Sequence, residues 1–244
     1  MDISASFSPP GLLLACALTA YLAFAAPALG KRQYDRLARR RDHEPGALVR
    51  MYRQWIAEEW VWVAVTALVL LLSPGVGLAD LGFAMPSHFG KVAPAVIGMS
   101  GAFVISVVTA RRLAGSGRTM PGLEGMRELL PRTSAERWHA LAMSVTAGVC
   151  EEIVYRGLLI ALGVGALGLS TTAAAALALA VFAVGHLYQG WMSMLGVAVA
   201  GCALTALYLT TGSLLLPILM HALMDIRGLV FTPQPARRTV GHAA

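Results

Sequence analysis

The chain has 244 residues, of which 57% are hydrophobic and 13% carry a formal charge, and its net charge is +6. So little polar material cannot cover a water-soluble globule, which excludes a soluble domain and indicates an integral membrane protein. The basic residues gather in two stretches beside apolar segments, as in the cytoplasmic loops of membrane proteins. We therefore do not expect nucleic acid as a partner.

The first apolar segment, residues 11–30, is about 20 residues long and is followed at once by basic residues, so we expect a membrane span and not a cleaved signal peptide. Residues 31–53 carry the first cluster of basic residues and predict a cytoplasmic loop, with the N-terminus outside. The second span is expected at about residues 55–72. Its tryptophans, Trp55, Trp60 and Trp62, are typical of an aromatic belt at the membrane interface.

A third span is expected at about 92–110, followed by a second basic loop at 111–137 and a fourth span at 138–155. The next apolar segment, 157–168, is too short for a straight crossing. Three alternatives stay open for it: a half-span, a re-entrant segment or a bent continuation of the preceding helix. The number of spans and the side on which the C-terminus emerges depend on that choice.

Three more spans follow, at 170–187, 193–210 and 214–231, with Pro217 expected to interrupt the last. The sequence thus predicts an all-α, polytopic transmembrane bundle of seven or eight helices. Three regions are expected: N-terminal helices with two basic loops (1–137), a transmembrane core (138–231) and a short polar tail (232–244).

Ionisable residues are rare in the core, where only five carry a formal charge: Glu151, Glu152, Arg156, Asp225 and Arg227. An ionisable group inside a membrane is costly, by about 2.5 to 3.5 kcal/mol on insertion scales, so such residues usually face a bundle interior and mark function. We therefore expect the active site in the C-terminal half of the chain.

Three pairs of polar or aromatic residues in the core are spaced four apart, which places both members of each pair on one helix face. The pairs are Glu152 with Arg156, Phe182 with His186, and His221 with Asp225. Glu151 lies about 100° round the helix from Glu152. One glutamate can therefore be held by the arginine while the other faces elsewhere, which suits one structural and one chemical carboxylate.

Glu151, His186 and His221 have the side chains of a hydrolytic site. A desolvated carboxylate can take a proton from water while a histidine holds that water or stabilises an oxyanion. The same three side chains are also a plausible ligand set for a catalytic zinc with an open water position. The residues alone do not choose between these mechanisms. A non-enzymatic polar cluster, as in an immunity or chaperone-like protein, and an ion transporter are further alternatives.

Three ordered motifs carry a family resemblance: Glu151-Glu152-x-x-x-Arg156, Phe182-x-x-x-His186 and His221-x-x-x-Asp225. In this order, on separate apolar segments, they resemble the motifs of the CPBP family, the CAAX-protease and bacteriocin-processing intramembrane proteases, also called Abi. The resemblance covers roughly residues 135–231. It implies an eight-helix-type membrane bundle that hydrolyses a peptide bond in a cavity open to the membrane, and makes 138–231 the catalytic core.

The resemblance also implies roles for individual residues. Glu151 would activate the water, and His186 and His221 would hold that water and the substrate carbonyl. Asp225 stands where the family commonly has an asparagine that stabilises the oxyanion. An ionised aspartate cannot donate a hydrogen bond, so orienting the water or acting as a ligand is the alternative. The supporting residues expected around the site are Glu152, Arg156, Tyr155 and Phe182.

The resemblance implies either a metal or a glutamate mechanism, and we favour the glutamate mechanism without a cofactor, with zinc held by Glu151, His186 and His221 as the alternative. The composition, with 17 arginines to 2 lysines and abundant Ala and Gly, indicates a bacterial origin. We therefore expect a multi-pass protein of the bacterial cytoplasmic membrane. Its expected partners are membrane lipid and a membrane-anchored peptide or protein substrate.

Overall fold

The structure is a computed structural model that describes residues 3–86 and 123–232, with scattered positions between 93 and 112. The expected third span, 92–110, is therefore described only at scattered positions, and residues 113–122 of the second basic loop, 111–137, lie outside the described residues. Within the described ranges the regular elements are all helical, apart from one isolated bridge. The prediction of an all-α bundle is confirmed.

The described residues form six long helical rods joined by short connections. The first rod comprises α1 (Pro9–Ala20), a π-helical turn (Tyr21–Ala25) and α2 (Ala26–Arg40), and the second is α3 (Ala47–Leu72). The third comprises α6 (Ser134–Glu151), a π-helical stretch η3 (Glu152–Leu159) and α7 (Ile160–Gly165). The last three are α8 (Thr171–Gly185), α9 (Trp191–Thr211), and α10 (Leu215–Asp225) with η5 (Ile226–Val230). Shorter helices are α5 (Leu123–Met126), η2 (Arg127–Leu129) and η4 (Leu187–Gln189).

Three helical segments among the described residues are long and apolar enough to cross a membrane: Pro9–Arg40, Ala47–Leu72 and Trp191–Thr211. The shorter α8 is also apolar. Together with the composition, these helices identify a membrane protein.

The first basic segment is more helical than predicted. Instead of a loop over 31–53, α2 continues to Arg40, and α3 begins at Ala47. Lys31 and Asp35 form an ion pair four residues apart, which is compatible with a solvated helix. The prediction was wrong because basic residues mark where a span reaches the membrane surface, whereas a helix can extend well beyond it.

The short apolar segment at 157–168 is a continuation of the preceding helix. The chain stays helical from 134 to 165 through η3 and α7, so the bent continuation is the alternative that the structure shows. The expected interruption at Pro217 is absent, because this proline lies in the first turn of α10, where its missing N–H breaks no helical hydrogen bond.

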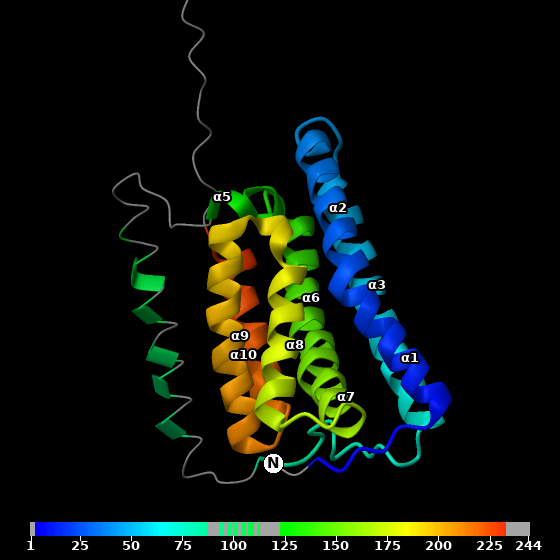
Figure 1. The fold of residues 1–244 in the computed structure, drawn as a ribbon. Coiled ribbons are helices and arrows are strands. Elements are labelled where there is room, and N and C mark those ends of the chain that lie inside the picture. Colours follow the sequence, from blue (N-terminus) through cyan, green and yellow to red (C-terminus); the bar gives the residue numbers. More distant parts are fainter. Residues whose placement is uncertain are drawn as a thin grey trace, which may run out of the picture.

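The rods run between two ends of the bundle (Figure 1). The 41–46 connection, α5, η4 and the end of η5 lie at one end, which we call the basic end because residues 31–53 reach it. The N-terminus and the start of α8 lie at the opposite end. Helix α6 packs against both α3 and α10, so it joins the N-terminal helices to the C-terminal core. The C-terminal end of η5 thus lies on the same side as the first basic segment.

A buried ion pair at the basic end ties α2 to α6. Nη1 and Nη2 of Arg41 donate to the two carboxylate oxygens of Glu136 at 2.6 and 3.0 Å, and both side chains are almost fully buried. The same carboxylate accepts hydrogen bonds from the backbone N–H groups of Arg132 and Thr133, which completes a capping box at the start of α6.

The Glu136 pair predicts a pH-dependent contribution to stability. Burial raises the pKa of Glu136, but the hydrogen bonds from Arg41, Arg132 and Thr133 outweigh it and hold this pKa below its ordinary value. The stabilisation is therefore complete above the ordinary carboxyl pKa of about 4.3 and is lost as the pH falls through the lower folded value. The thermal unfolding midpoint of the wild type in detergent should fall more steeply below about pH 4 than that of Glu136→Gln. Parallel curves would contradict this.

Candidate active site

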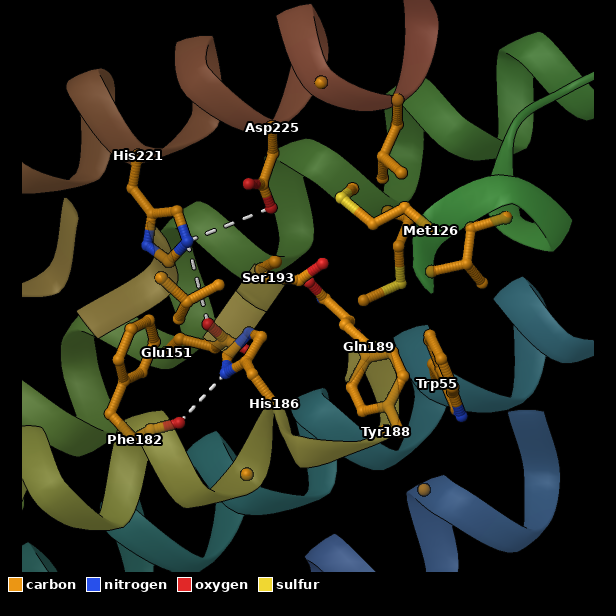
Figure 2. A pocket seen from close by; sticks show the side chains of 18 of the residues that line it. Trp55, Met126, Glu151, Phe182, His186, Tyr188, Gln189, Ser193, His221 and Asp225 are labelled. Carbon is orange, nitrogen blue, oxygen red and sulfur yellow. Dashed lines mark hydrogen bonds and ion pairs between the residues drawn. The ribbon is translucent and has the colours of Figure 1, made fainter. Parts of the chain in front are cut away.

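A cavity of about 430 Å³ opens between the helices near the basic end. Most of its wall is apolar, and residues of α8, α9 and α10 contribute much of it. Trp55, Glu59 and Trp62 of α3 also line it, so the N-terminal helices complete a site that was expected in the C-terminal half. Figure 2 shows the polar group of His221, Asp225 and Glu151 on one side and Trp55 on the other.

Glu152 and Arg156 form a buried support beneath the cavity. Nη1 of Arg156 donates to Oε1 of Glu152 at 2.7 Å, and these two residues are 2% and 0% exposed. Nη2 of the same arginine donates to the backbone oxygen of Gly201 on α9 at 3.1 Å, and the guanidinium lies 4.5 Å from the ring centroid of Phe182 on α8. This arginine therefore ties η3 to two neighbouring helices.

His221 on α10 is held by the same glutamate. Its Nδ1 lies 2.7 Å from Oε1 of Glu152. Since an ionised carboxylate only accepts, Nδ1 carries the hydrogen, and Nε2 is the nitrogen that faces the other acidic groups. Nε2 lies 3.7 Å from Oε2 of Glu151 and 3.8 Å from Oδ2 of Asp225 (Figure 2). The ring thus stands among three carboxyl groups.

Glu151 presents an unused carboxylate oxygen on the cavity wall, next to His221. Its side chain is buried on the cavity wall, and its Oε2 has no hydrogen-bond partner among the described residues. The distance of 3.7 Å between this Oε2 and Nε2 of His221 is too long for a direct hydrogen bond. A polar separation above 3.5 Å is the kind that one water molecule bridges. The arrangement therefore offers a position for a water between a base and an imidazole.

His186 caps the C-terminus of α8 and lines the same cavity as Glu151 (Figure 2). Its Nδ1 lies 2.9 Å from the backbone oxygen of Phe182, so Nδ1 donates, and Nε2 is left for the cavity. Phe182 packs against the rings of His186, His221 and Tyr155 at centroid distances of 4.7, 6.0 and 5.3 Å. This phenylalanine sets the spacing of the two histidines.

The donor atoms do not form a metal centre in this arrangement. Among the residues that the structure describes, no three His, Cys, Asp or Glu side chains are grouped to hold a metal ion. Nδ1 of His221 is already bound to Glu152, and Nδ1 of His186 to a backbone oxygen. Both hydrogen bonds leave Nε2 free toward the cavity, as they would in a histidine that binds a metal, so they do not separate a water held by zinc from a water activated by Glu151 alone.

Glu59 is a cavity residue that the sequence reasoning missed. It lies on α3, is 5% exposed, and its Oε2 has no hydrogen-bond partner among the described residues. The neighbouring Glu58 accepts a hydrogen bond from the Tyr21 hydroxyl. Two adjacent glutamates inside a predicted span were a usable signal, because a charge in an apolar segment is costly. Tyr188 and Gln189 of η4 also line the cavity, and no sequence signal singled them out.

Gly148 allows α6 and α10 to approach closely beside the site. A Cβ at this position would lie 2.8 Å from the backbone nitrogen and Cβ of Ala222, the residue after His221. Gly148→Ala should therefore displace α10, lower stability by about 1 to 3 kcal/mol and reduce activity. The matched control for stability is Gly196→Ala on α9, where a Cβ meets nothing within 4 Å. Equal thermal unfolding midpoints for the two variants would contradict the prediction.

The C-terminal core of the chain matches one known protein family. Residues 133–227 match the family model described as type II CAAX prenyl endopeptidase Rce1-like. The matched segment contains all three motifs and runs from the capping residue of α6 into η5. A comparison with the curated proteins and one with the solved structures each returned no match. The match supports a protease, and residues 133–227 of this membrane protein are thus similar to the Rce1-like family, which confirms the CPBP resemblance over this segment.

Proposed function

We propose that this protein is an intramembrane endopeptidase that hydrolyses a peptide bond of a membrane-associated peptide or protein, with water activated by Glu151. One observation carries the proposal. A buried carboxylate oxygen without a hydrogen-bond partner among the described residues lies 3.7 Å from an imidazole nitrogen, on the wall of a mostly apolar cavity. The family match supports the reaction class.

Glu151 acts as a general base and then as a general acid. Its carboxylate takes a proton from the water, whose oxygen attacks the carbonyl carbon of the peptide bond. The resulting tetrahedral intermediate carries the negative charge on the former carbonyl oxygen. Protonated Glu151 then gives its proton to the leaving nitrogen as the C–N bond breaks. The products are a new carboxyl terminus and a new amino terminus.

The two histidines hold the reacting oxygens. With Nδ1 fixed on each ring, Nε2 accepts a hydrogen bond from the water when the ring is neutral and donates to the oxyanion when it is protonated. Glu152 and Arg156 keep His221 in place. Asp225, whose Oδ2 lies 3.8 Å from Nε2 of His221, orients that ring or the water, because an ionised carboxylate cannot donate to an oxyanion.

The shape and surroundings of the cavity favour a membrane-anchored substrate. Its wall carries many apolar side chains, among them Trp62, Met192 and Val197, which suit the apolar part of a chain held in lipid. The cavity lies near the basic end, which is the cytoplasmic end under the charge bias of membrane proteins. The proposed location is the bacterial cytoplasmic membrane, with membrane lipid as the surrounding partner.

The histidine variants test this proposal. The purified protein is placed in liposomes with a pool of palmitoyl-anchored peptides that carry a randomised segment, and products are identified by mass spectrometry. His186→Ala and His221→Ala should each lower cleavage by roughly 10²-fold or more. His139→Ala is the control, because His139 is half-buried outside the cavity lining and its Nδ1, like that of His186, lies close to the backbone oxygen four residues earlier, at 2.8 Å. Full cleavage by both site variants would refute the proposal.

Removing metal ions separates the two mechanisms. Because the donor atoms do not converge on a metal position, we expect cleavage to be unchanged after dialysis against a zinc chelator. Loss of cleavage with chelator, and its recovery on adding Zn²⁺, would contradict the glutamate mechanism while keeping the protease assignment.

A further inference from the structure

The cavity is acidic. Four carboxyl groups line it, from Glu58, Glu59, Glu151 and Asp225, whereas Arg227 is the only lysine or arginine among its described lining residues. Three of the four carboxyl groups lie next to a histidine ring or accept a hydrogen bond from a tyrosine. Glu151 and Asp225 face His221, and Glu58 accepts a hydrogen bond from a tyrosine hydroxyl.

Glu59 is the cavity carboxyl group that has neither a role in the proposed reaction nor a hydrogen-bond partner for its Oε2 among the described residues. It is 5% exposed on α3. A buried carboxylate of this kind is costly unless a donor or a cation meets it. We therefore expect a donor or cation on the bound substrate to meet the carboxylate of Glu59.

Aromatic rings accompany this carboxyl group. Trp55 lies four residues before Glu59, so both are on one face of α3, and both line the cavity. The ring of Tyr188 packs edge-on against Trp55 at a centroid distance of 5.3 Å, and Figure 2 shows the two rings side by side. A carboxylate together with aromatic rings is a combination that binds an ammonium or guanidinium group through an ion pair and cation–π contacts.

We propose that Glu59, with Trp55 and Tyr188, forms a specificity site for a lysine or arginine side chain of the substrate, close to the scissile bond. The inference rests on the proposed function, because the basic side chain belongs to the peptide that Glu151 cleaves. The cavity contains both glutamates, so the basic residue is within a few positions of the cleaved bond.

The peptide pool in liposomes tests the inference. Among the products of the wild type, lysine and arginine should be enriched at one fixed position relative to the cleaved bond. Glu59→Gln should reduce that enrichment by about tenfold or more, because it removes one partner of a desolvated ion pair. Glu58→Gln is the matched control: it removes the adjacent carboxylate, which already has a hydrogen-bond partner, and should keep the enrichment.

A second measurement needs no variant and covers the case in which Glu59→Gln does not fold. The best-cleaved lysine-containing peptide is compared with the same peptide carrying acetyl-lysine, which removes the charge and keeps the aliphatic part of the side chain. We expect cleavage to slow by about tenfold or more. Glu151-dependent cleavage with no basic preference, or equal rates for the two peptides, would overturn the specificity site alone. No cleavage of any peptide in the pool would instead count against the proposed function.

Discussion

Replacing Glu151 by glutamine should lower kcat/KM for peptide cleavage by roughly 10²- to 10⁴-fold, the range that a general base contributes. The amide has nearly the shape of the carboxylate but cannot take a proton from water. Its side chain would keep the same buried position on the cavity wall, so folding should be little affected. The measurement is the initial rate on a defined palmitoyl-anchored peptide in liposomes.

The matched control is Glu44→Gln, the same change at a carboxylate that is 40% exposed, pairs with Arg50 and does not line the cavity. It should cleave at the wild-type rate. Thermal unfolding of both variants checks that any loss comes from chemistry and not from misfolding. A folded Glu151→Gln protein with wild-type kcat/KM would exclude Glu151 as the base.

Replacing Arg156 by methionine should destabilise the protein by about 3 to 5 kcal/mol, because it leaves the charge of Glu152 buried without its arginine. The same change removes the hydrogen bond to the backbone of Gly201 and the contact with Phe182. Since Glu152 also holds Nδ1 of His221, activity should fall in the fraction that still folds. Equilibrium unfolding in mixed detergent measures the effect.

Lys31→Met provides the control for Arg156→Met. Lys31 pairs with Asp35 four residues away on a solvated helix face, with side chains 52% and 41% exposed. Such a surface pair is worth about 0 to 1 kcal/mol, so its loss should barely change stability. If Arg156→Met is as stable as Lys31→Met, the buried support described for His221 does not exist.

The local part of the site follows from helical spacing. The pairing of Glu152 with Arg156 and the placing of Phe182 beside His186 need only the rule that residues four apart share a helix face. The hydrogen bond from His221 to Glu152 was not predictable in this way, because it joins residues 69 positions apart on different rods. This hydrogen bond depends on how α6 packs against α10, which helical spacing does not predict.

Some predictions from the sequence were wrong or incomplete, for instance where a residue type is equally suited to two places in the structure. Trp55 was assigned to an interfacial belt, yet it lines the cavity, because an aromatic ring at a helix end suits either place. Glu59 was missed because charges were counted only from residue 138 onward. The extent of α2 was underestimated, since basic residues mark the membrane surface and do not end a helix.

The most direct test of the account is cleavage of the anchored peptide in water enriched in oxygen-18. The wild type in liposomes should produce two fragments, and the new carboxyl terminus should carry one oxygen-18 atom from the attacking water. Glu151→Gln, folded to the same extent, should leave the peptide intact. An intact peptide with the wild type, or labelled fragments in equal amounts from both proteins, would contradict the assignment of this cavity as a glutamate-dependent peptidase site.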